Sequence, residues 1–218
     1  MTTSNLYVDI HILQDVPPAN LNRDETGSPK RARYGGVDRL RLSSQSQKRA
    51  ARLDFREHMD AESLGYRTRR VNDIVVDSLV AGGVPEEVAR PATAELLQQI
   101  KITQSKKKDA EASYLLFLSR PQLKALAAQV RAHEDLWASP KELSSVINVK
   151  DILGHGHALD VALFGRMVAD LPEINVDAAV QVSHALGTHE ALTQFDYFTA
   201  VDDAQGEAEP GAGMIGTV

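Results

Sequence analysis

Hydroxyl and amide side chains and a group of cations share residues 39–56, where the pattern of a strand changes to that of a helix. Helix starts expose free backbone N–H groups and carry partial positive charge, so they attract phosphate. The neutral donors are Ser43, Ser44, Gln45 and Ser46, and the cations on the following helix are Lys48, Arg49, Arg52 and Arg56. This combination favours non-covalent binding of a polyanion by its backbone.

The charges of the chain are unevenly distributed. The 218 residues carry a net charge of −6, yet residues 22–56 contain ten Lys or Arg and four Asp or Glu, a local net charge of +6. The remainder therefore carries −12, and nine acidic residues but no Lys or Arg follow Arg166. A segregated field can bind a polyanion on one face and repel it elsewhere. An ordinary solvated basic helix fits the same charges, and the acidic remainder could also dock on the basic window of a neighbouring copy.

The composition excludes several classes of protein. With no cysteine in the sequence, disulfides, thiol catalysis and Cys-ligated zinc are excluded. The N-terminus lacks the basic and apolar regions of a signal peptide, and no apolar run reaches membrane-spanning length. The sequence therefore predicts a soluble cytoplasmic protein of one large or two small domains.

Apolar alternation and loop residues outline the first quarter of the chain. Residues 5–14 alternate and predict a half-buried strand, residues 15–36 predict a long loop, and residues 37–43 predict a second strand. A helix is expected to begin at Ser44, which has the spacing of a capping box with Gln47. Ser44 is therefore either a helix cap or a phosphate donor.

Helical spacing dominates residues 68–133. One helix is expected to begin near Val71 and end at Gly82 and Gly83, and a second to follow Pro85, split or kinked at Pro91. A buried strand is expected over 113–119 and a helix over 121–130, with weaker helical character from 140 to 153. The lysines at 106–108 fit a helix cap or a solvated loop.

The last quarter changes character. Residues 159–168, 177–187 and 195–201 predict strands, and residues 202–213 form an acidic segment rich in Gly, Pro and Ala that we expect to be mobile. The final MIGTV resembles the opening of a further strand, which suggests a shortened chain. Strands separated by a helical insertion predict an α+β fold whose sheet is built from distant segments.

Several motifs resemble one known family in their order and spacing. They are LNRDETGSPK, YGGVDRLRLSSQSQKRA, ALFGRM, SHALGTH and FDYFTAVDD. Together they resemble the CasC-type backbone subunit of the type I-E CRISPR surveillance complex, Cascade. The resemblance implies an RNA-recognition-motif-like (ferredoxin-like) palm over residues 1–58 and 155–218, with a protruding thumb at about 190–218. It also implies a mainly helical finger insertion over 59–154, and that the C-terminal part of the family fold is missing here.

The resemblance further implies a non-catalytic role that needs no cofactor or metal. In that family, copies line up head to tail in a helical array along one CRISPR RNA, together with other Cascade subunits. They hold the backbone of the RNA, and the thumb flips out bases at intervals. The intervening segments pair with target DNA, so base pairing reads the sequence while protein reads shape and charge.

Ten residues of this chain carry the implied RNA contacts. Those expected to touch phosphates and sugars are Arg23, Lys30, Ser43, Gln45, Lys48, Arg49 and Arg52, those expected near flipped bases are Met167 and Phe198, and Thr199 belongs to the thumb. Core packing is an open alternative for Met167 and Phe198, and a local ion pair with Asp24 is one for Arg23.

Two departures from related patterns affect these expectations. The Gly-Phe-aromatic core of ordinary RNA-recognition sheets is absent from the sequence, so bases are not expected to stack on the sheet. The expected thumb tip is acidic and cannot contribute a cationic contact. Its acidic residues are Asp202, Asp203, Glu207 and Glu209.

A metal-dependent hydrolase is the main rival interpretation. His155 and His157 have ligand-like spacing, which His184 and Asp202 could complete. No fuller metal-binding motif accompanies them, so a Gly-hinged loop for the first two and a sheet pairing for His184 explain the same residues. A scaffold that binds only protein, through its acidic and basic faces, is a third interpretation.

Overall fold

The computed structural model describes residues 6–101, 104–105, 108–112, 115–192, 194–199 and 213–217, in two compact units. We call residues 1–47 and 183–218 the sheet unit and residues 48–182 the helical unit. The expected acidic residues at 202, 203, 207 and 209 and the lysines at 106 and 107 lie outside the described residues.

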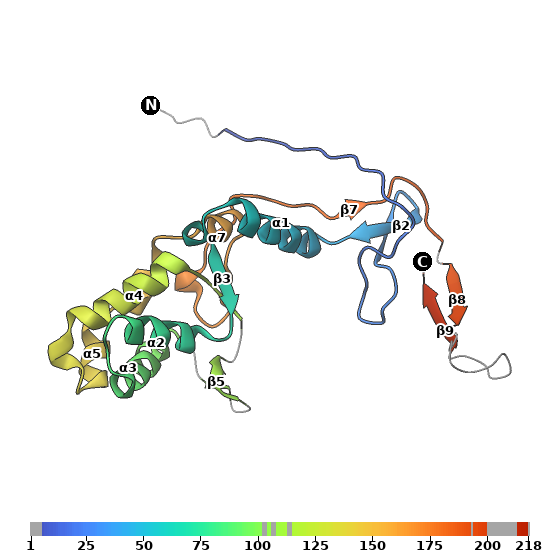
Figure 1. Cartoon of the computed structure of the whole chain (residues 1–218). Helices are drawn as coiled ribbons and strands as arrows, with labels where there is room; N and C mark the ends of the chain where they lie inside the picture. The colour runs from blue at the N-terminus through green and yellow to red at the C-terminus, as the bar shows by residue number, and fades with distance from the viewer. Residues whose placement is uncertain are drawn as a thin grey trace. The chain divides into compact units, whose positions relative to one another are not determined.

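A β-hairpin forms the centre of the sheet unit (Figure 1). Strand β1 (Arg31–Tyr34) pairs antiparallel with β2 (Val37–Leu42). The two residues between them, Gly35 and Gly36, have φ angles of +65° and +85°, which a two-residue hairpin turn requires and glycine adopts without strain. On its other edge β2 pairs with β7 (Ala185–Leu186), giving the sheet order β1-β2-β7. The long loop expected over 15–36 therefore contains a strand.

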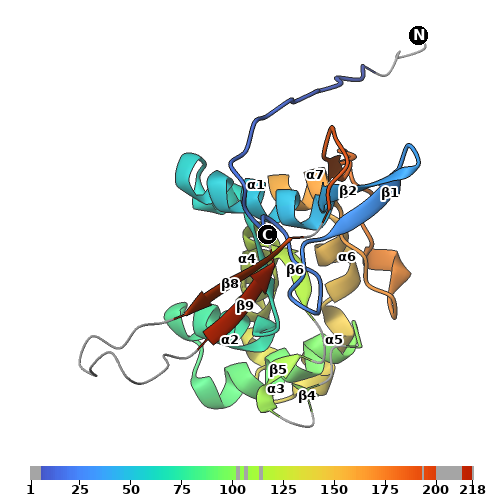
Figure 2. The ribbon, with the colours of Figure 1, turned by 90° about the vertical axis from the view of Figure 1, so that its right-hand side faces the viewer.

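A second hairpin belongs to the same unit. Strand β8 (Phe195–Thr199) pairs antiparallel with β9 (Gly213–Thr217), and Figure 2 shows the two strands side by side. The strand expected over 195–201 is thus confirmed over most of its length.

The strand expected over residues 5–14 is wrong for the described part, residues 6–14. These residues adopt no regular secondary structure and are drawn as an extended trace in Figure 1. The apolar face is open to solvent, with Leu6, Ile10 and Ile12 exposed by 90%, 79% and 82%. A strand needs a neighbour that satisfies its backbone groups, and no described residue pairs with this segment.

Helices make up most of the helical unit. Helix α1 (Ser44–His58) begins at the expected residue, and its residues from Lys48 onward belong to this unit. The others are α2 (Val71–Ala81), α3 (Glu86–Gln98), α4 (Arg120–Ala132), α5 (Pro140–Val146), α6 (Val149–Gly154) and α7 (Leu159–Phe164), with short 3-10 turns at Ala61–Ser63, Glu134–Leu136 and Pro172–Ile174. No helix in the described part of the chain is long and apolar enough to cross a membrane.

The hydrophobic core of the helical unit lies among α2, α3, α4, α5 and α6 (Figure 1). Leu79 of α2, Leu96 of α3 and Leu126 of α4 are each at most 1% exposed. Helix α3 is not split at Pro91. Pro91 and Glu87, whose carbonyl loses an intrahelical donor, are both exposed, so water can replace the missing bond.

Two short antiparallel ladders complete the helical unit. Strand β3 (Gly65–Thr68) pairs with β6 (Leu116–Ser119), which confirms the strand expected over 113–119 for its second half. Strand β4 (Gln104–Ser105) pairs with β5 (Lys108–Ala112). At the end of β6, Ser119 and Gln122 form a capping box that begins α4.

Two expected strands are wrong. Residues 159–164 form helix α7, and the only pairing that follows within 165–168 is an isolated bridge between Arg166 and Val176. Of residues 177–187, only Ala185 and Leu186 are in a strand. The helical face of α7 buries Asp160 and Val161 next to each other, which an alternating strand could not do. The α+β class is nevertheless confirmed, as a mixture of helices with small antiparallel sheets.

Candidate nucleic-acid interface

The start of α1 is capped one residue earlier than its sequence predicts. Ser43, only 7% exposed, accepts the Ser46 N–H on its Oγ at 3.3 Å, while the Ser43 N–H donates to Asn22 Oδ1 at 2.9 Å. The expected capping box between Ser44 and Gln47 is therefore wrong. Because Ser43 fixes the first turn and Asn22 fixes Ser43, the strand-to-helix junction is held by side chains from two segments.

Other donors at this junction are also engaged. The Ser44 N–H donates to His184 Nδ1 at 3.1 Å, and Gln47 Nε2 donates to the Ser183 carbonyl at 3.0 Å. Gln45 is exposed, and its backbone N–H has no acceptor among the described residues. Gln45 therefore supplies the open donor at the start of α1, where the helix dipole favours an anion.

The loop before β1 is closed on itself and tied to β2. Arg23 forms a bridge with Pro29, the Lys30 N–H donates to the Asn22 carbonyl at 2.7 Å, and the Arg41 N–H donates to the Lys30 carbonyl at 2.9 Å. Through Asn22 the loop also holds Ser43. The sheet unit thus brings together Arg23, Lys30 and Ser43, three of the predicted site residues.

Asp24 does not neutralise Arg23. Its Oδ1 accepts the Thr26 N–H at 2.9 Å, the Thr26 hydroxyl at 2.7 Å and the Ser28 N–H at 3.0 Å. Hydrogen bonds from Thr26 lower the pKa of Asp24, with a smaller contribution from the charge of Lys30. No ion pair between Arg23 and Asp24 forms in the described structure, so the exposed guanidinium keeps its charge for another partner.

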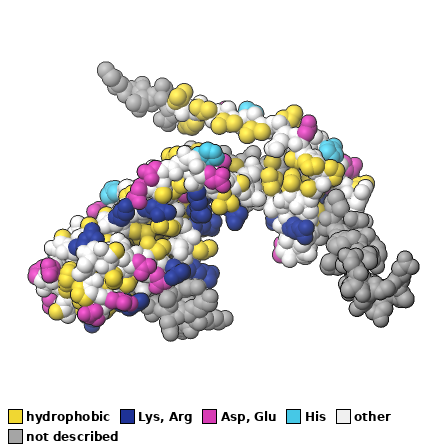
Figure 3. Space-filling view, viewed as in Figure 1, with side chains coloured by type: hydrophobic (Ala, Val, Ile, Leu, Met, Phe, Trp, Pro, Cys, Tyr) yellow, Lys and Arg dark blue, Asp and Glu magenta, His cyan; other side chains and the backbone are white. Residues whose placement is uncertain are grey.

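Lys48, Arg49 and Arg52 of α1, the three cations predicted to contact RNA, fall into two groups. Lys48 and Arg49 have no acidic partner among the described residues, and dark blue side chains gather below α1 and beside β3 in Figure 3. The Lys48 ammonium lies 5.8 Å from the centre of the Phe164 ring. Phe164 itself stacks on Phe55 of α1, with ring centres 6.1 Å apart. These two cations are available for phosphate.

Arg52 is different because it is paired and largely buried. Its Nε lies 3.2 Å from Asp160 Oδ2, and the two side chains are 13% and 3% exposed. The guanidinium also covers the Phe117 ring at 4.3 Å. The other Asp160 oxygen accepts the Gly65 N–H at 2.8 Å. Arg52 therefore joins α1 to α7 and to the β3–β6 ladder.

Met167 projects into solvent. It is 85% exposed, so the core-packing alternative for Met167 is wrong. The preceding Arg166 is 5% exposed and donates to the carbonyls of Ile174 and Leu153, each at 2.8 Å. Burial lowers the pKa of Arg166 to about 10. The buried side chain of Arg166 thus anchors a turn from which Met167 points outward.

The predicted thumb residues lie on β8. Phe198 pairs with Met214 and Thr199 with Gly213 across the β8–β9 hairpin. A base contact for Phe198 stays a prediction.

The histidines of the rival interpretation have separate surroundings. His155 lies 3.5 Å from Asp151, His157 Nδ1 lies 3.1 Å from Gln122 Nε2, and His184 accepts the Ser44 N–H. Burial, followed by the charge of Arg166, lowers the pKa of His157. Within the described ranges no three His, Asp or Glu residues lie close enough to hold a metal ion, and Asp202 lies outside those ranges.

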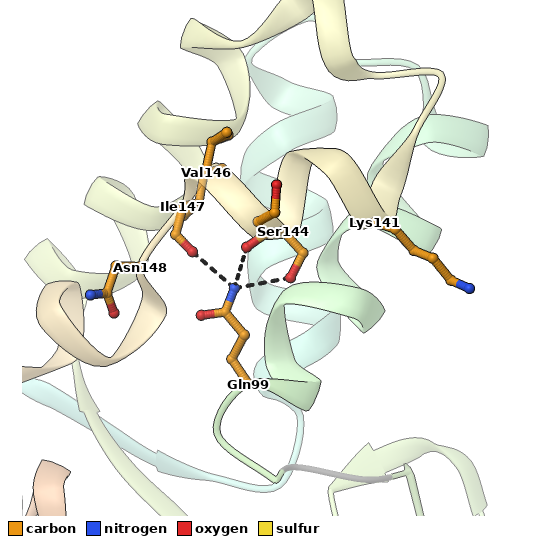
Figure 4. A pocket seen from close by; sticks show the side chains of 7 residues that line it. Gln99, Lys141, Ser144, Val146, Ile147 and Asn148 are labelled. Atoms are coloured by element: carbon orange, nitrogen blue, oxygen red, sulfur yellow. Dashed lines mark hydrogen bonds between the residues drawn. The ribbon is translucent and has the colours of Figure 1, made fainter.

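A shallow pocket between the end of α3 and α5 does not favour a catalytic site. Gln99 Nε2 donates to the Ser144 carbonyl at 2.6 Å and to the Ile147 carbonyl at 2.9 Å (Figure 4). Its Oε1 accepts the Val149 N–H at 3.2 Å. The amide is therefore fully used in holding α5 and α6, and Lys141 points away from it (Figure 4).

Sequence reasoning did not identify several residues that shape this interface. Asn22 ties the loop to the helix start, and Arg166 anchors the turn of Met167. Arg67 of β3 is exposed and has no ion pair in the described structure. Arg67 lies outside the basic residues 22–56, so nothing in the sequence groups it with the cations of α1. The structure does so, because Arg67 lies opposite Phe117, whose ring is covered by Arg52 of α1.

The chain is similar to known proteins both in sequence family and in structure. A family model described as CT1975-like protein matches residues 8–218. A chain from a solved "CRISPR RNA-guided surveillance complex, pre-nicking" is 33% identical over 91% of this chain, with a TM-score of 0.71. A chain from another "CRISPR RNA-guided surveillance complex" is 34% identical over 80% of this chain, with a TM-score of 0.66. The present chain spans 57% and 56% of those two chains. No curated protein matches it.

Proposed function

Because the chain belongs to the family of CT1975-like proteins, we propose that it is a non-catalytic backbone subunit that binds CRISPR RNA in a type I-E surveillance complex. The observation that carries the proposal is its likeness to chains of CRISPR RNA-guided surveillance complexes. Unpaired cations occur in each unit, on α1 and in the loop before β1, and they provide a physical basis because each of them can neutralise a phosphate.

In this role the protein holds RNA without reading its sequence. Arg23, Lys30, Lys48 and Arg49 contact phosphates, while Ser43 and Gln45 donate hydrogen bonds at the start of α1. Arg52 stays a predicted RNA contact, although its pair with Asp160 leaves less of its charge for phosphate. Exposed Met167 contacts unstacked bases. We assign Phe198 and Thr199 to a thumb that also contacts unstacked bases.

The partners follow from this role. Copies of the chain assemble head to tail in a helical array along one guide RNA, beside other Cascade subunits, and target DNA binds through the guide. We retain the division into a palm (residues 1–58 and 155–218), a thumb (about 190–218) and a finger (59–154) as part of the proposal. Localisation in the cytoplasm remains a prediction from the sequence, which lacks cysteine. No observation on the described residues favours the metal-dependent hydrolase.

Binding of single-stranded RNA tests the proposal. Fluorescence anisotropy of the purified full chain with several unrelated labelled RNAs should give similar affinities. If about four phosphates are neutralised, the logarithm of the affinity should fall with the logarithm of salt concentration at a slope near −3. A flat salt response, or strong preference for one sequence, would contradict the proposal.

Two matched pairs of substitutions make this test specific. Lys48→Gln with Arg49→Gln should weaken binding to every RNA and flatten the salt slope by about 1.4, since two phosphate contacts are lost. Arg90→Gln with Lys150→Gln removes the same charge from surface residues that are paired with Glu86 and Glu173. That control should bind as the wild type does. Equal losses in both pairs would mean that net charge alone drives binding.

A further inference from the structure

The β3–β6 ladder of the helical unit carries a cation next to an aromatic ring. Arg67 of β3 is paired with Phe117 of β6 in the antiparallel register. Side chains at directly opposite positions point to the same face of a sheet, with Cβ atoms about 5 Å apart. Arg67 is exposed, whereas Phe117 is half-buried. The two therefore share one outward face of the ladder.

A side chain of helix α1 reaches that same face. The guanidinium of Arg52 covers the Phe117 ring at 4.3 Å, and its charge is balanced by Asp160. Residues four apart on a helix share a face, so Lys48 lies one turn before Arg52 on this side of α1. The ammonium of Lys48 covers Phe164 at 5.8 Å. Cations and rings thus alternate from α1 onto the ladder.

The charges of this surface are unbalanced. Neither Lys48 nor Arg67 has an acidic partner among the residues that the structure describes. Some exposed cations elsewhere in the helical unit do have an acidic partner: Arg90 pairs with Glu86, Lys124 with Glu62 and Lys150 with Glu173. The unpaired cations Lys48 and Arg67 therefore lie next to the contact between the Arg52 guanidinium and the Phe117 ring. The buried ion pair with Asp160 fixes the position of that guanidinium.

We infer that Arg67 and Lys48 flank a second set of contacts to the phosphodiester backbone of a nucleic-acid strand, with Arg67 as a contact outside the basic window of the sequence. The inference rests on the proposed function. The guanidinium of arginine presents paired donors that match the oxygens of a phosphate. Because Arg67 lies opposite Phe117, whose ring is covered by Arg52, the positions open to the Arg67 side chain are restricted. Because Phe117 is already covered by Arg52, this surface grips the backbone and not a base.

Arg67→Gln tests the inference in the full-length protein. The substitution removes one exposed charge, so the thermal unfolding temperature should not change. Affinity for single-stranded RNA should weaken roughly 3- to 10-fold near 0.1 M salt, and the salt slope should flatten by about 0.7. Arg67→Lys should restore part of the affinity. Arg90→Gln, an exposed residue paired with Glu86, is the control of equal charge and should bind normally.

A second arm identifies the strand that is bound. The same RNA is measured alone and annealed to complementary DNA. Weakening of both by Arg67→Gln places the contact on the guide strand, and weakening of the hybrid alone places it on the DNA strand. Either result supports a phosphodiester contact.

Three other results would overturn the inference. In the first, Arg67→Gln binds RNA as tightly as the wild type, while Lys48→Gln with Arg49→Gln binds it more weakly. That result rejects the inference about Arg67 and leaves the proposed function intact. Wild-type binding by both variants rejects the proposed function as well. If Arg67→Gln instead lowers self-association of the RNA-free protein in sedimentation experiments and leaves RNA binding unchanged, the surface docks a second copy of the chain.

Discussion

Replacing Arg52 by methionine should destabilise the protein by removing the counter-charge of a buried carboxylate. Arg52 Nε lies 3.2 Å from Asp160 Oδ2, and the Asp160 side chain is only 3% exposed. Methionine keeps an apolar stem over Phe117 but carries no charge. Asp160 would then keep the hydrogen bond that its other oxygen accepts from the Gly65 N–H at 2.8 Å. The decrease in the free energy of unfolding therefore comes from the unpaired charge of buried Asp160 and not from a packing defect.

The expected magnitude follows from the burial of the pair. Removing one partner of a buried ion pair costs about 3–5 kcal/mol, because the other charge is left without compensation. Arg52 retains 13% exposure, so water can reach the site and the lower end of that range applies. A shift of about 2–4 °C per kcal/mol in a protein of this size then predicts a fall in unfolding temperature of roughly 6–12 °C.

Thermal and urea unfolding of the full chain, followed by circular dichroism, measure this loss. Asp160→Asn should recover part of the stability when combined with Arg52→Met, because the double variant buries no unpaired charge. Arg90→Met breaks an exposed pair and should cost at most about 1 kcal/mol. If Arg52→Met unfolds at the wild-type temperature but flattens the salt slope of RNA binding by about 0.7, its charge contacts phosphate and the structural argument is wrong.

Two further predictions concern the segments around α7. Burial and the charge of Arg166 lower the pKa of His157 below 6.5, so the unfolded chain takes up a proton first and stability should fall as the pH drops below about 6.5. His157→Gln should flatten that decline between about pH 7 and 5 in urea unfolding, and an unchanged decline would contradict this cause. Gly165→Ala should cost about 1–3 kcal/mol, because φ is +77° and the new Cβ would lie 2.9 Å from the Val176 carbonyl. Gly156→Ala, with φ +63° and open space, should cost less in thermal unfolding, and equal losses would contradict the steric argument.

Local signals in the sequence predicted the helices well. The Gly82–Gly83 pair ended α2, Pro85 preceded α3, and Ser119 began α4 close to the expected residues. These signals act within a few residues, through capping hydrogen bonds and backbone freedom, so one sequence contains them. The resemblance of the motifs to a known family also predicted likeness to chains of CRISPR surveillance complexes, and this likeness is confirmed. The type I-E assignment, the assembly and the individual RNA contacts remain proposals.

Elements that depend on distant partners were not predictable in the same way. The alternation of residues 6–14 indicates a strand, but alternation alone does not supply a neighbouring strand, and none pairs with it in the described structure. Residues 159–168 were predicted as a strand, because a short, mainly apolar run does not by itself separate a strand from a helix. Helix α7 is favoured because it places Asp160 where Arg52 and the Gly65 N–H can satisfy it. Those partners lie about a hundred residues away in sequence.

The same dependence decides which cations of α1 can bind a polyanion. Lys48 and Arg52 are one turn apart, carry the same charge and were indistinguishable in the sequence. Asp160 neutralises Arg52 and fixes its guanidinium over Phe117, while Lys48 keeps its charge. Arg52 covers the ring of Phe117, and Phe117 lies opposite Arg67 in the β3–β6 ladder. The positive charge of Arg52 that Asp160 neutralises on α1 is therefore replaced by the charge of Arg67 on the ladder. The electropositive surface is therefore set by which cations are left unpaired in the folded chain, and its composition differs from that of the basic window.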